Sequence, residues 1–215
     1  MSLEPGVKRV SRKIPLEDDP DDFVGYEVLI DFIKQRALYK LKGDIIETGA
    51  YMGIGTAKLA KFARRYGKKV YAVDVFDPGL DRTVSKSGIK AGDVYEAFLQ
   101  GRSMLEAYRE STRGFDNIVT IREDSKKVSF PQEQRFIFGF IDGCHQQAYV
   151  ENDFHVIWPH LVSGGALGFH DYKYDDWPDV TKAADKLMRE HKREISEAYE
   201  LEGKYNILSL LMIKK

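Results

Sequence analysis

Apolar residues recur at helical spacing between residues 23 and 41, where they predict an amphipathic first helix. A regular alternation of short apolar runs and helical stretches follows. The predicted strands cover residues 44–48, 69–74, 118–122, 136–142 and 166–170, and the predicted helices cover residues 56–66, 149–161 and 180–191. Strands that alternate with helices in this way are typical of an α/β fold built on a parallel sheet.

Two further strands are predicted at the end of the chain, at residues 195–201 and 206–213, with a short turn-like stretch between them. Strands joined so tightly must pair antiparallel. We therefore expect a Rossmann-like three-layer sandwich of the α/β class. Its seven-stranded sheet should be mostly parallel and should end in a C-terminal antiparallel hairpin strand.

The first 21 residues are polar and rich in proline and acidic residues, which predicts a flexible N-terminal arm (1–21) ahead of a single domain (22–215). Within that domain, residues 75–117 form a connection far longer than the usual few residues. Apolar spacing predicts one or two helices in it, and the glycine- and serine-containing stretch 79–92 predicts a mobile segment. The insertion is either a lid over a substrate or the arm of a homodimer.

The charge balance bears on the kind of partner. The 33 basic and 34 acidic residues nearly cancel, so there is no global positive field to attract nucleic acid or an anionic membrane, and a small molecule is the expected partner. Cys144 is the single cysteine, which excludes an internal disulfide and fits a reducing compartment. No apolar run approaches the roughly 20 residues that span a bilayer, and we expect a cytoplasmic protein.

A glycine-rich turn is the strongest local signal. The stretch from Glu47 to Gly55 reads ETGAYMGIG, where a predicted strand ends and a predicted helix begins. Glycine permits positive φ and close backbone approach, so backbone N–H groups at the start of the helix can face an anionic ligand group. Tight packing of the chain is the alternative explanation. The dinucleotide spacing G-x-G-x-x-G would place Lys58 where a small residue is needed, which argues against NAD.

Acidic and hydroxyl side chains follow the next two strands. Asp74 ends the second strand, where a carboxylate can accept hydrogen bonds from both hydroxyls of a ribose. Asp124 and Ser125 end the third strand, where they suit the edge of an adenine ring, although helix capping is an equally good role. A glycine turn, an acid and an Asp-Ser pair at successive strand ends match the layout of a ligand crevice.

The stretches ETGAYMGIGT, YAVDVFD and REDS resemble the first three motifs of class I S-adenosylmethionine-dependent methyltransferases. The hairpin at the end of the sheet also distinguishes that variant of the Rossmann-like fold from dehydrogenases. The resemblance implies S-adenosylmethionine as the cofactor. The residues it places around that cofactor are Glu47, Gly49, Tyr51, Gly53, Gly55, Asp74, Asp124, Ser125 and Asp142.

Two later stretches, FIDGCH at 140–145 and GGALGFHDY at 164–172, resemble the cephalosporin hydroxylase-like and macrolide-sugar O-methyltransferase family, of the methyltransferase 24 type. Its metal-dependent members use carboxylates at positions matching Asp142 and Asp171, with an acidic residue where this chain has His170. Three carboxylates suit Mg²⁺, whereas two carboxylates and an imidazole suit Mn²⁺, Fe²⁺ or Zn²⁺ better, or indicate that the metal has been lost.

An alcohol must lose its proton before it accepts a methyl group, so a base or a divalent metal is needed beside it. We expect Asp142 to lie beside the transferred methyl group and His145 to act as the general base. Asp171 and His170 then either bind the metal or orient the acceptor. A structural role is the alternative for both His145 and His170, as a helix cap or through a bond to a backbone carbonyl, and helix capping is the alternative for Asp142.

The predicted activity is therefore O-methylation of a small-molecule hydroxyl. Two alternatives remain open at this point. One is an N-methyltransferase or an enzyme acting on a macromolecule, although the sequence has no basic stripe. The other is a cofactor-binding protein without methyl transfer, or a hydroxylase-like relative, for which the departure at His170 leaves room.

Overall fold

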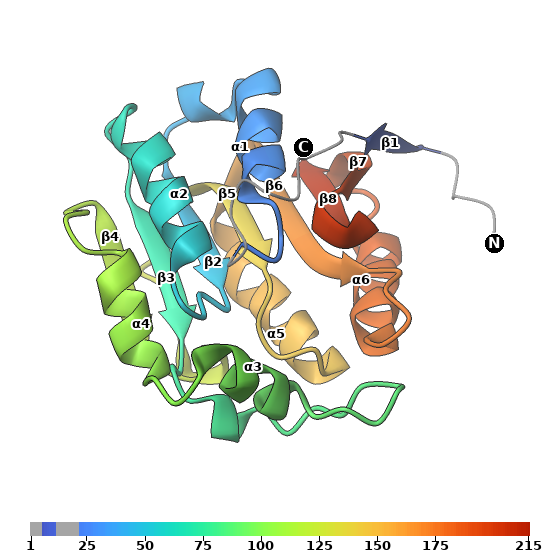
Figure 1. Cartoon of the computed structure of the whole chain (residues 1–215). Helices are drawn as coiled ribbons and strands as arrows, with labels where there is room; N and C mark the ends of the chain where they lie inside the picture. Colours follow the sequence, from blue (N-terminus) through green and yellow to red (C-terminus); the bar gives the residue numbers. More distant parts are fainter. Residues whose placement is uncertain (1–5, 12–21) are drawn as a thin grey trace.

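The computed structural model describes residues 6–11 and 22–215, which form an α/β sandwich around one mixed sheet (Figure 1). The strand order is β1-β7-β8-β6-β5-β2-β3-β4. Strand β8 pairs antiparallel with both β6 and β7, and every other pairing is parallel. The strands are β1 (Val7–Ser11), β2 (Asp44–Thr48), β3 (Val70–Asp74), β4 (Ile118–Arg122), β5 (Phe136–Ile141), β6 (Leu161–Tyr172), β7 (Ile195–Glu202) and β8 (Leu208–Lys214). The predicted fold class is confirmed.

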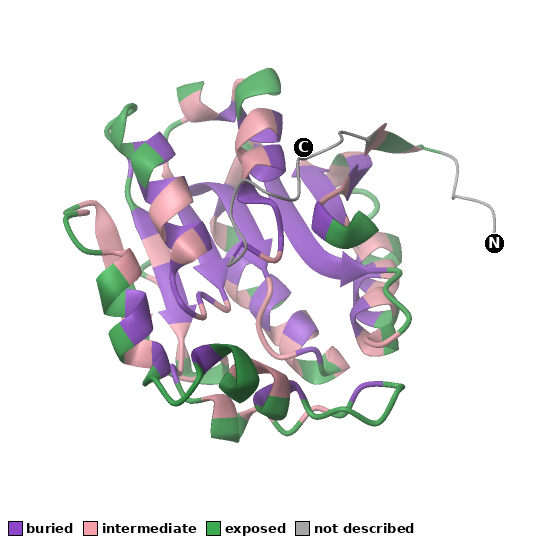
Figure 2. Ribbon diagram, viewed as in Figure 1, coloured by how far each residue is buried: buried purple, intermediate pink, exposed green. Residues whose placement is uncertain are grey.

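Helices cover both faces of the sheet. The helices are α1 (Tyr26–Gln35), α2 (Ile54–Arg64), α3 (Ala91–Leu99), α4 (Met104–Ser111), α5 (Gln147–Ile157) and α6 (Pro178–Glu190), with short 3-10 turns between elements. Helices α1 and α2 pack with Ile45 on one face, and α5 and α6 pack with Ile46 on the other (Figure 1). The central strands of the sheet are buried along their length (Figure 2). Successive residues of a strand point to opposite faces, so a strand covered by helices on both faces, such as β5, is apolar at every position.

Strand β1 is the one strand that was not predicted from the sequence. It lies within residues 1–21, which were predicted as a flexible arm, and it makes the sheet eight-stranded rather than seven-stranded. It pairs parallel with β7 along the edge of the sheet, and Lys8 forms an ion pair with Glu197 on that strand. Polar residues at an edge strand leave little hydrophobic signal, because one side faces solvent. The rest of the predicted arm lies outside the described residues.

Helix α1 begins at Tyr26, later than predicted. The carboxylate of Asp22 accepts hydrogen bonds from the backbone N–H groups of Val24, Gly25 and Tyr26, at 2.7–3.1 Å. Asp22 thereby stabilises a turn over the residues that precede the helix, so the helix begins only at Tyr26. The helix ends at Gln35, and Ala37 then adopts a positive φ of 52°, which interrupts the predicted helix before the 3-10 turn Leu38–Lys40.

The long connection after β3 contains the predicted helices. Helix α4 packs Met104, Ala107 and Tyr108 into a small apolar cluster with Ala72 and Phe76. Helix α3 and the chain before it lie below the end of β3 in Figure 1 and are largely exposed in Figure 2. No helix in the described part of the chain is long and apolar enough to cross a membrane.

Gly55 sets the distance between α1 and α2. A Cβ atom at this position would lie 2.1 Å from the ring of Tyr26, so α1 can approach α2 only over a glycine. We therefore expect Gly55→Ala to destabilise the protein by about 1–3 kcal/mol through overpacking, measured by urea unfolding. Lys61→Ala on the exposed side of α2 is the control and should change stability by less than about 0.5 kcal/mol. Equal stability of Gly55→Ala and the parent protein would contradict this account.

Candidate active site

A cavity of about 900 Å³ opens at the carboxyl edge of the sheet. Its walls come from the segments that follow β2, β3, β4, β5 and β6, from α3, and from the loop between β7 and β8. Parallel strands bring their carboxyl ends to one edge, so residues far apart in sequence meet there. Of the predicted site residues, the cavity is lined by Gly49, Tyr51, Gly53, Gly55, Asp74, Asp124, Ser125, Asp142, His145, His170 and Asp171.

Unusual backbone conformations occur around this cavity. Tyr51, Asp171 and Tyr205 line it and have φ values of 48°, 53° and 55°. Residues with side chains rarely adopt positive φ, and such conformations persist only where the surrounding structure holds them. Such conformations are frequent at binding sites, so the backbone conformation is a second indication that this cavity binds a ligand.

The glycine turn brings two loops into contact. Gly49 has a φ of 86°, and a Cβ atom there would lie 2.0 Å from the backbone oxygen of Asp142. Gly53 has a φ of 79° at the N-terminus of α2, and a Cβ atom would lie 2.8 Å from the ring of Tyr108. Both glycines are therefore required for tight packing of the chain, which was the alternative explanation drawn from the sequence. Both also line the cavity.

Asp74 holds the turn to β3. Its carboxylate accepts hydrogen bonds from the backbone N–H groups of Tyr51, at 2.9 Å, and Phe76, at 2.6 Å. Burial raises the pKa of Asp74 in spite of these bonds, which favour the charged form. Asp74 also lines the cavity, so a contact with the ribose remains a prediction.

Glu47 lies behind the glycine turn rather than in the cavity. The side chain is fully buried, and its carboxylate accepts hydrogen bonds from the hydroxyls of Tyr26, at 3.2 Å, and Thr56. Burial raises the pKa of Glu47 from its usual value near 4.5 to about 8. This position does not support the direct cofactor contact expected from the sequence. Glu47 instead links β2 to α1 and α2, and a strand pattern alone cannot show which partners a buried carboxylate finds.

Asp124 and Ser125 occupy the third strand end. Asp124 caps the 3-10 turn Ser125–Lys127 by accepting the backbone N–H of Lys126 at 3.0 Å, and it also accepts the hydroxyl of Tyr149 at 3.3 Å. The capping role considered from the sequence is therefore present. Both residues also line the cavity, so a contact with adenine remains a prediction.

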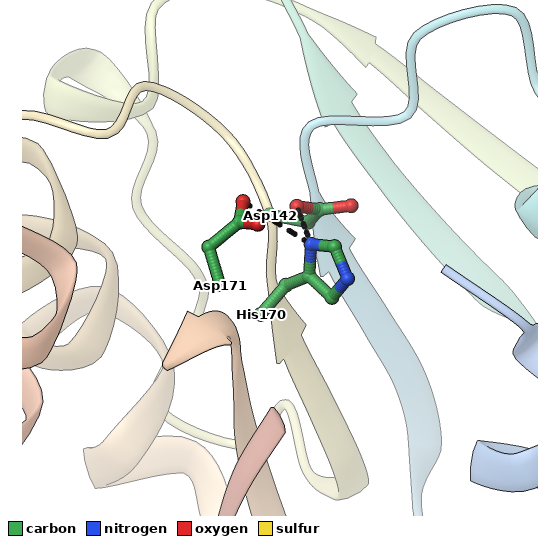
Figure 3. A group of neighbouring side chains, drawn as sticks. All are labelled: Asp142, His170 and Asp171. Carbon is green, nitrogen blue, oxygen red and sulfur yellow. Dashed lines mark ion pairs between the residues drawn. The ribbon is translucent and has the colours of Figure 1, made fainter. Parts of the chain in front are cut away.

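Asp142, His170 and Asp171 form a compact group at the ends of β5 and β6 (Figure 3). The Nδ1 atom of His170 lies 3.0 Å from Oδ1 of Asp142 and 3.2 Å from Oδ2 of Asp171. One donor atom from each residue fits within 4.8 Å of the others. The group could thus hold a metal ion, and it consists of the three residues named from the sequence as candidate metal ligands.

His145 extends this group. Its Nε2 atom lies 2.8 Å from Oδ2 of Asp171, the oxygen that also faces His170. Its ring stacks on Trp177, with centroids 4.5 Å apart and planes 16° from parallel. Nδ1 of His145 and Nε2 of His170 are buried without a hydrogen-bond partner among the described residues. Each imidazole therefore has one buried ring nitrogen without a partner in the described part of the chain.

The two imidazoles and Asp171 stabilise one another's charged forms. Burial opposes a charge on His145 and on His170, yet their acidic neighbours outweigh it and raise both pKa values. Burial likewise opposes the charge on Asp171, and the two imidazoles outweigh it and hold the pKa of this carboxyl below its usual range. Buried charges are tolerated when they are paired in this way. The site therefore keeps an ionised carboxylate out of bulk water.

Several residues that line the cavity were not among the predicted site residues. Asp153 is 2% exposed, and burial raises its pKa against the opposing hydrogen bond from Ser125. The sequence did contain an indication of its role, because Asp153 is an acidic residue beside the apolar Phe154 on a predicted helix, and acidic residues are rarely buried without a partner. Phe98 and Tyr205 also line the cavity, but they come from the insertion and from a hairpin loop, where no local pattern predicts the cavity.

The sheet order, the antiparallel β8 between β6 and β7, and the glycine turn beside an acid define the Rossmann-like fold of class I S-adenosylmethionine-dependent methyltransferases. The chain belongs to the methyltransferase 24-type family, whose family model, described as a methyltransferase domain, matches residues 46–172. The protein is thus an S-adenosylmethionine-dependent methyltransferase. It has no significant match among curated proteins.

Three solved structures illustrate the likeness of fold. The O-methyltransferase NovP has a TM-score of 0.63 at 16% identity, covering 88% of this chain and 79% of NovP. The calicheamicin methyltransferase CalS11 has a TM-score of 0.60 at 16% identity, covering 86% of this chain and 77% of CalS11. An rRNA methylase from Streptococcus thermophilus has a TM-score of 0.54 at 15% identity, covering 84% and 94%. Because these acceptors differ, the fold alone does not identify the acceptor.

The raised pKa of Glu47 predicts a specific pH dependence of stability. Between about pH 4.5 and 8 the folded protein holds a proton on Glu47 that the unfolded chain releases, so the free energy of unfolding should fall as pH rises. The slope is at most about 1.4 kcal/mol per pH unit. Glu47→Gln should remove this contribution, measured by urea unfolding from pH 5 to 9.

Glu106→Gln, at an exposed position on α4, is the control for Glu47→Gln and should keep the parent slope. If Glu47→Gln and the parent protein lose stability equally between pH 5 and 8, Glu47 does not carry a proton in the folded state.

Proposed function

We propose that this methyltransferase acts on a hydroxyl oxygen of a small-molecule acceptor, beside a divalent cation held by Asp142, His170 and Asp171. The proposal depends chiefly on one observation: this group lines the same cavity as the glycine turn and Asp74. NovP is an O-methyltransferase and CalS11 is described as a TDP-rhamnose 3'-O-methyltransferase, which supports oxygen as the accepting atom.

The cofactor side of the cavity fits S-adenosylmethionine. When bound, this cofactor supplies an activated methyl group on a sulfonium that is already a leaving group. The backbone of the glycine turn suits its carboxylate, and Asp74 suits its ribose hydroxyls. Asp124 and Ser125 are the proposed contacts of the adenine ring. The protein's remaining task is to orient an acceptor and remove its proton.

The spacing of Asp142, His170 and Asp171 fits a cation. Nδ1 of His170 lies 3.0 and 3.2 Å from one oxygen of each carboxylate, so a cation held by the three residues would take the place of the proton that these contacts favour on the imidazole. The mixed oxygen and nitrogen set suits Mn²⁺, Fe²⁺ or Zn²⁺ better than Mg²⁺. When bound, such an ion would lower the pKa of a coordinated hydroxyl.

His145 is the proposed proton acceptor. In the tautomer that donates Nε2–H to Asp171, Nδ1 carries the free lone pair, and this atom has no partner among the described residues. Asp171 fixes the tautomer, and the stacked ring of Trp177 fixes the orientation of the imidazole. A positioned base of this kind contributes about 10²- to 10⁴-fold to a rate.

The insertion at 75–117 is proposed to cover the bound ligands. Pro78, Leu80 and Phe98 from this segment line the cavity. Thr83 lies 3.3 Å from Sγ of Cys144, and the backbone N–H of Lys86 donates to the backbone oxygen of Asp176. The segment therefore contacts the loop after β5 and the loop after β6. These contacts favour the lid over the dimerisation arm.

Metal dependence is the direct test of the proposed site. We expect Mn²⁺ to bind the chelator-treated protein and to restore methyl transfer, and Asp171→Asn to weaken Mn²⁺ binding by at least tenfold. Binding is measured by electron paramagnetic resonance and needs no acceptor. Asp175→Asn, at an exposed position outside the cavity, is the control. Full turnover by metal-free protein would rule out the cation.

The role of His145 is tested separately. His145→Ala should lower turnover on a hydroxylated acceptor by about 10²- to 10⁴-fold while calorimetry shows nearly unchanged affinity for S-adenosylmethionine, because the cofactor contacts lie on other strands. His155→Ala, on the exposed side of α5, should leave both quantities unchanged. Parent-like turnover of His145→Ala would show that His145 is not the base.

A further inference from the structure

The cavity divides into two halves along the strand order. The proposed cofactor contacts follow β2, β3 and β4, and Asp142 follows β5, whereas His170 and Asp171 end β6. Beyond this group the cavity continues over β6 and β8. We call that part the acceptor half; it is lined by Phe23, Phe98, Tyr174, Trp177, Tyr205 and Ile207.

Aromatic rings dominate the acceptor half, and several are exposed. Tyr174 is 38% exposed, Phe98 is 49% exposed and Tyr205 is 54% exposed. Phe98 packs against Phe23 with ring centroids 4.7 Å apart. These rings come from four separate segments of the chain and line one cavity. Exposed aromatic surface gathered in a concave site is typical of a binding surface for a ligand of matching chemistry.

The loop that carries Tyr205 is held in an uncommon conformation. Tyr205 and Asn206 have φ values of 55° and 60°, a costly arrangement for two consecutive residues other than glycine. The loop is fixed by a hydrogen bond from Gly203 to the backbone oxygen of Ile207, at 2.8 Å. A second bond runs from Lys204 to the backbone oxygen of Val24, at 3.2 Å. The fold thus holds an exposed tyrosine at the edge of the cavity.

The charges of this half disfavour an anionic acceptor. Asp81 lines it, and Asp142 and Asp171 at its border are already paired with the imidazoles of His145 and His170. Among the described residues that line the cavity in these segments, Arg82 carries the one guanidinium or ammonium group, and it is exposed. A diphosphate or a carboxylate normally requires paired arginine or lysine contacts. Arg122 and Lys127 line the cavity near β4, on the cofactor side.

From these observations we infer that the acceptor is a flat, uncharged aromatic ring that carries the hydroxyl to be methylated. Stacking between the exposed rings would hold its plane, while its oxygen reaches the group of Asp142, His170 and Asp171. The inference rests on the proposed O-methyltransferase function and adds the class of substrate. It separates this protein from enzymes that act on nucleotide-linked sugars, because among the described residues the acceptor half offers a diphosphate only the exposed guanidinium of Arg82.

Three probes with one carbon skeleton test the inference. Their affinities are measured by calorimetry on the full chain saturated with S-adenosylhomocysteine. We expect 2-naphthol, which is flat and uncharged, to bind at least tenfold more tightly than decahydro-2-naphthol, which is saturated, and than 6-hydroxy-2-naphthoate, which is anionic. dTDP-rhamnose is included as a nucleotide-linked sugar and should bind more weakly than 2-naphthol.

Substitutions locate the bound ring. Phe98→Ala and Tyr174→Ala remove exposed side chains, and each should weaken 2-naphthol binding about five- to tenfold without changing the affinity for S-adenosylhomocysteine. Tyr66→Ala is the matched control, because Tyr66 is 41% exposed and lies near the amino end of β3, away from the cavity. It should leave both affinities unchanged.

The outcomes separate the inference from the proposed function. Tighter binding of dTDP-rhamnose or 6-hydroxy-2-naphthoate, or no binding of 2-naphthol to the saturated protein, overturns the acceptor class. Each of these results leaves the Mn²⁺ and cofactor measurements as they were. Failure to bind both S-adenosylhomocysteine and Mn²⁺ would instead remove the proposed function, and the inference with it.

Discussion

The contact between the loops after β2 and β5 is the constraint on which the site depends. Gly49 donates its backbone N–H to Val73, and Asp142 donates its backbone N–H to Thr48, each at 2.9 Å. A side chain at position 49 would collide with the backbone of Asp142. The glycine turn that is proposed to face the cofactor therefore also determines where the backbone of Asp142 lies.

The buried ionic group gives the site its chemistry. Asp171 faces His145 on one side and His170 on the other, and His170 in turn faces Asp142. Such a chain costs less to bury than its separate members, because each charge has a partner. It also orients two imidazole rings, each with one nitrogen that has no partner among the residues that the structure describes. Asp171 contacts both imidazoles, so its carboxylate would support both the proposed cation and the proposed proton acceptor.

The substitution of an acid by His170 thus has a structural consequence. In the family pattern three carboxylates would crowd negative charge at this edge, and a cation would be needed to balance it. In this chain an imidazole between two carboxylates supplies part of that balance (Figure 3). The nearby aromatic rings add apolar surface rather than further positive charge. Together these features suit a neutral acceptor beside a cationic cofactor.

The sequence by itself determined the order of elements, the glycine turn and the acids at successive strand ends, because these depend on local periodicity and on backbone geometry within a few residues. Asp74, Asp142, His170 and Asp171 all lie where their strand ends predicted. Only the tertiary structure decided that Glu47 turns toward α1 and α2, that β1 joins the sheet, and that Tyr205 reaches the cavity. Each of these depends on contacts between segments far apart in the chain, and hydrophobic patterning specifies which face is buried but not which partner covers it.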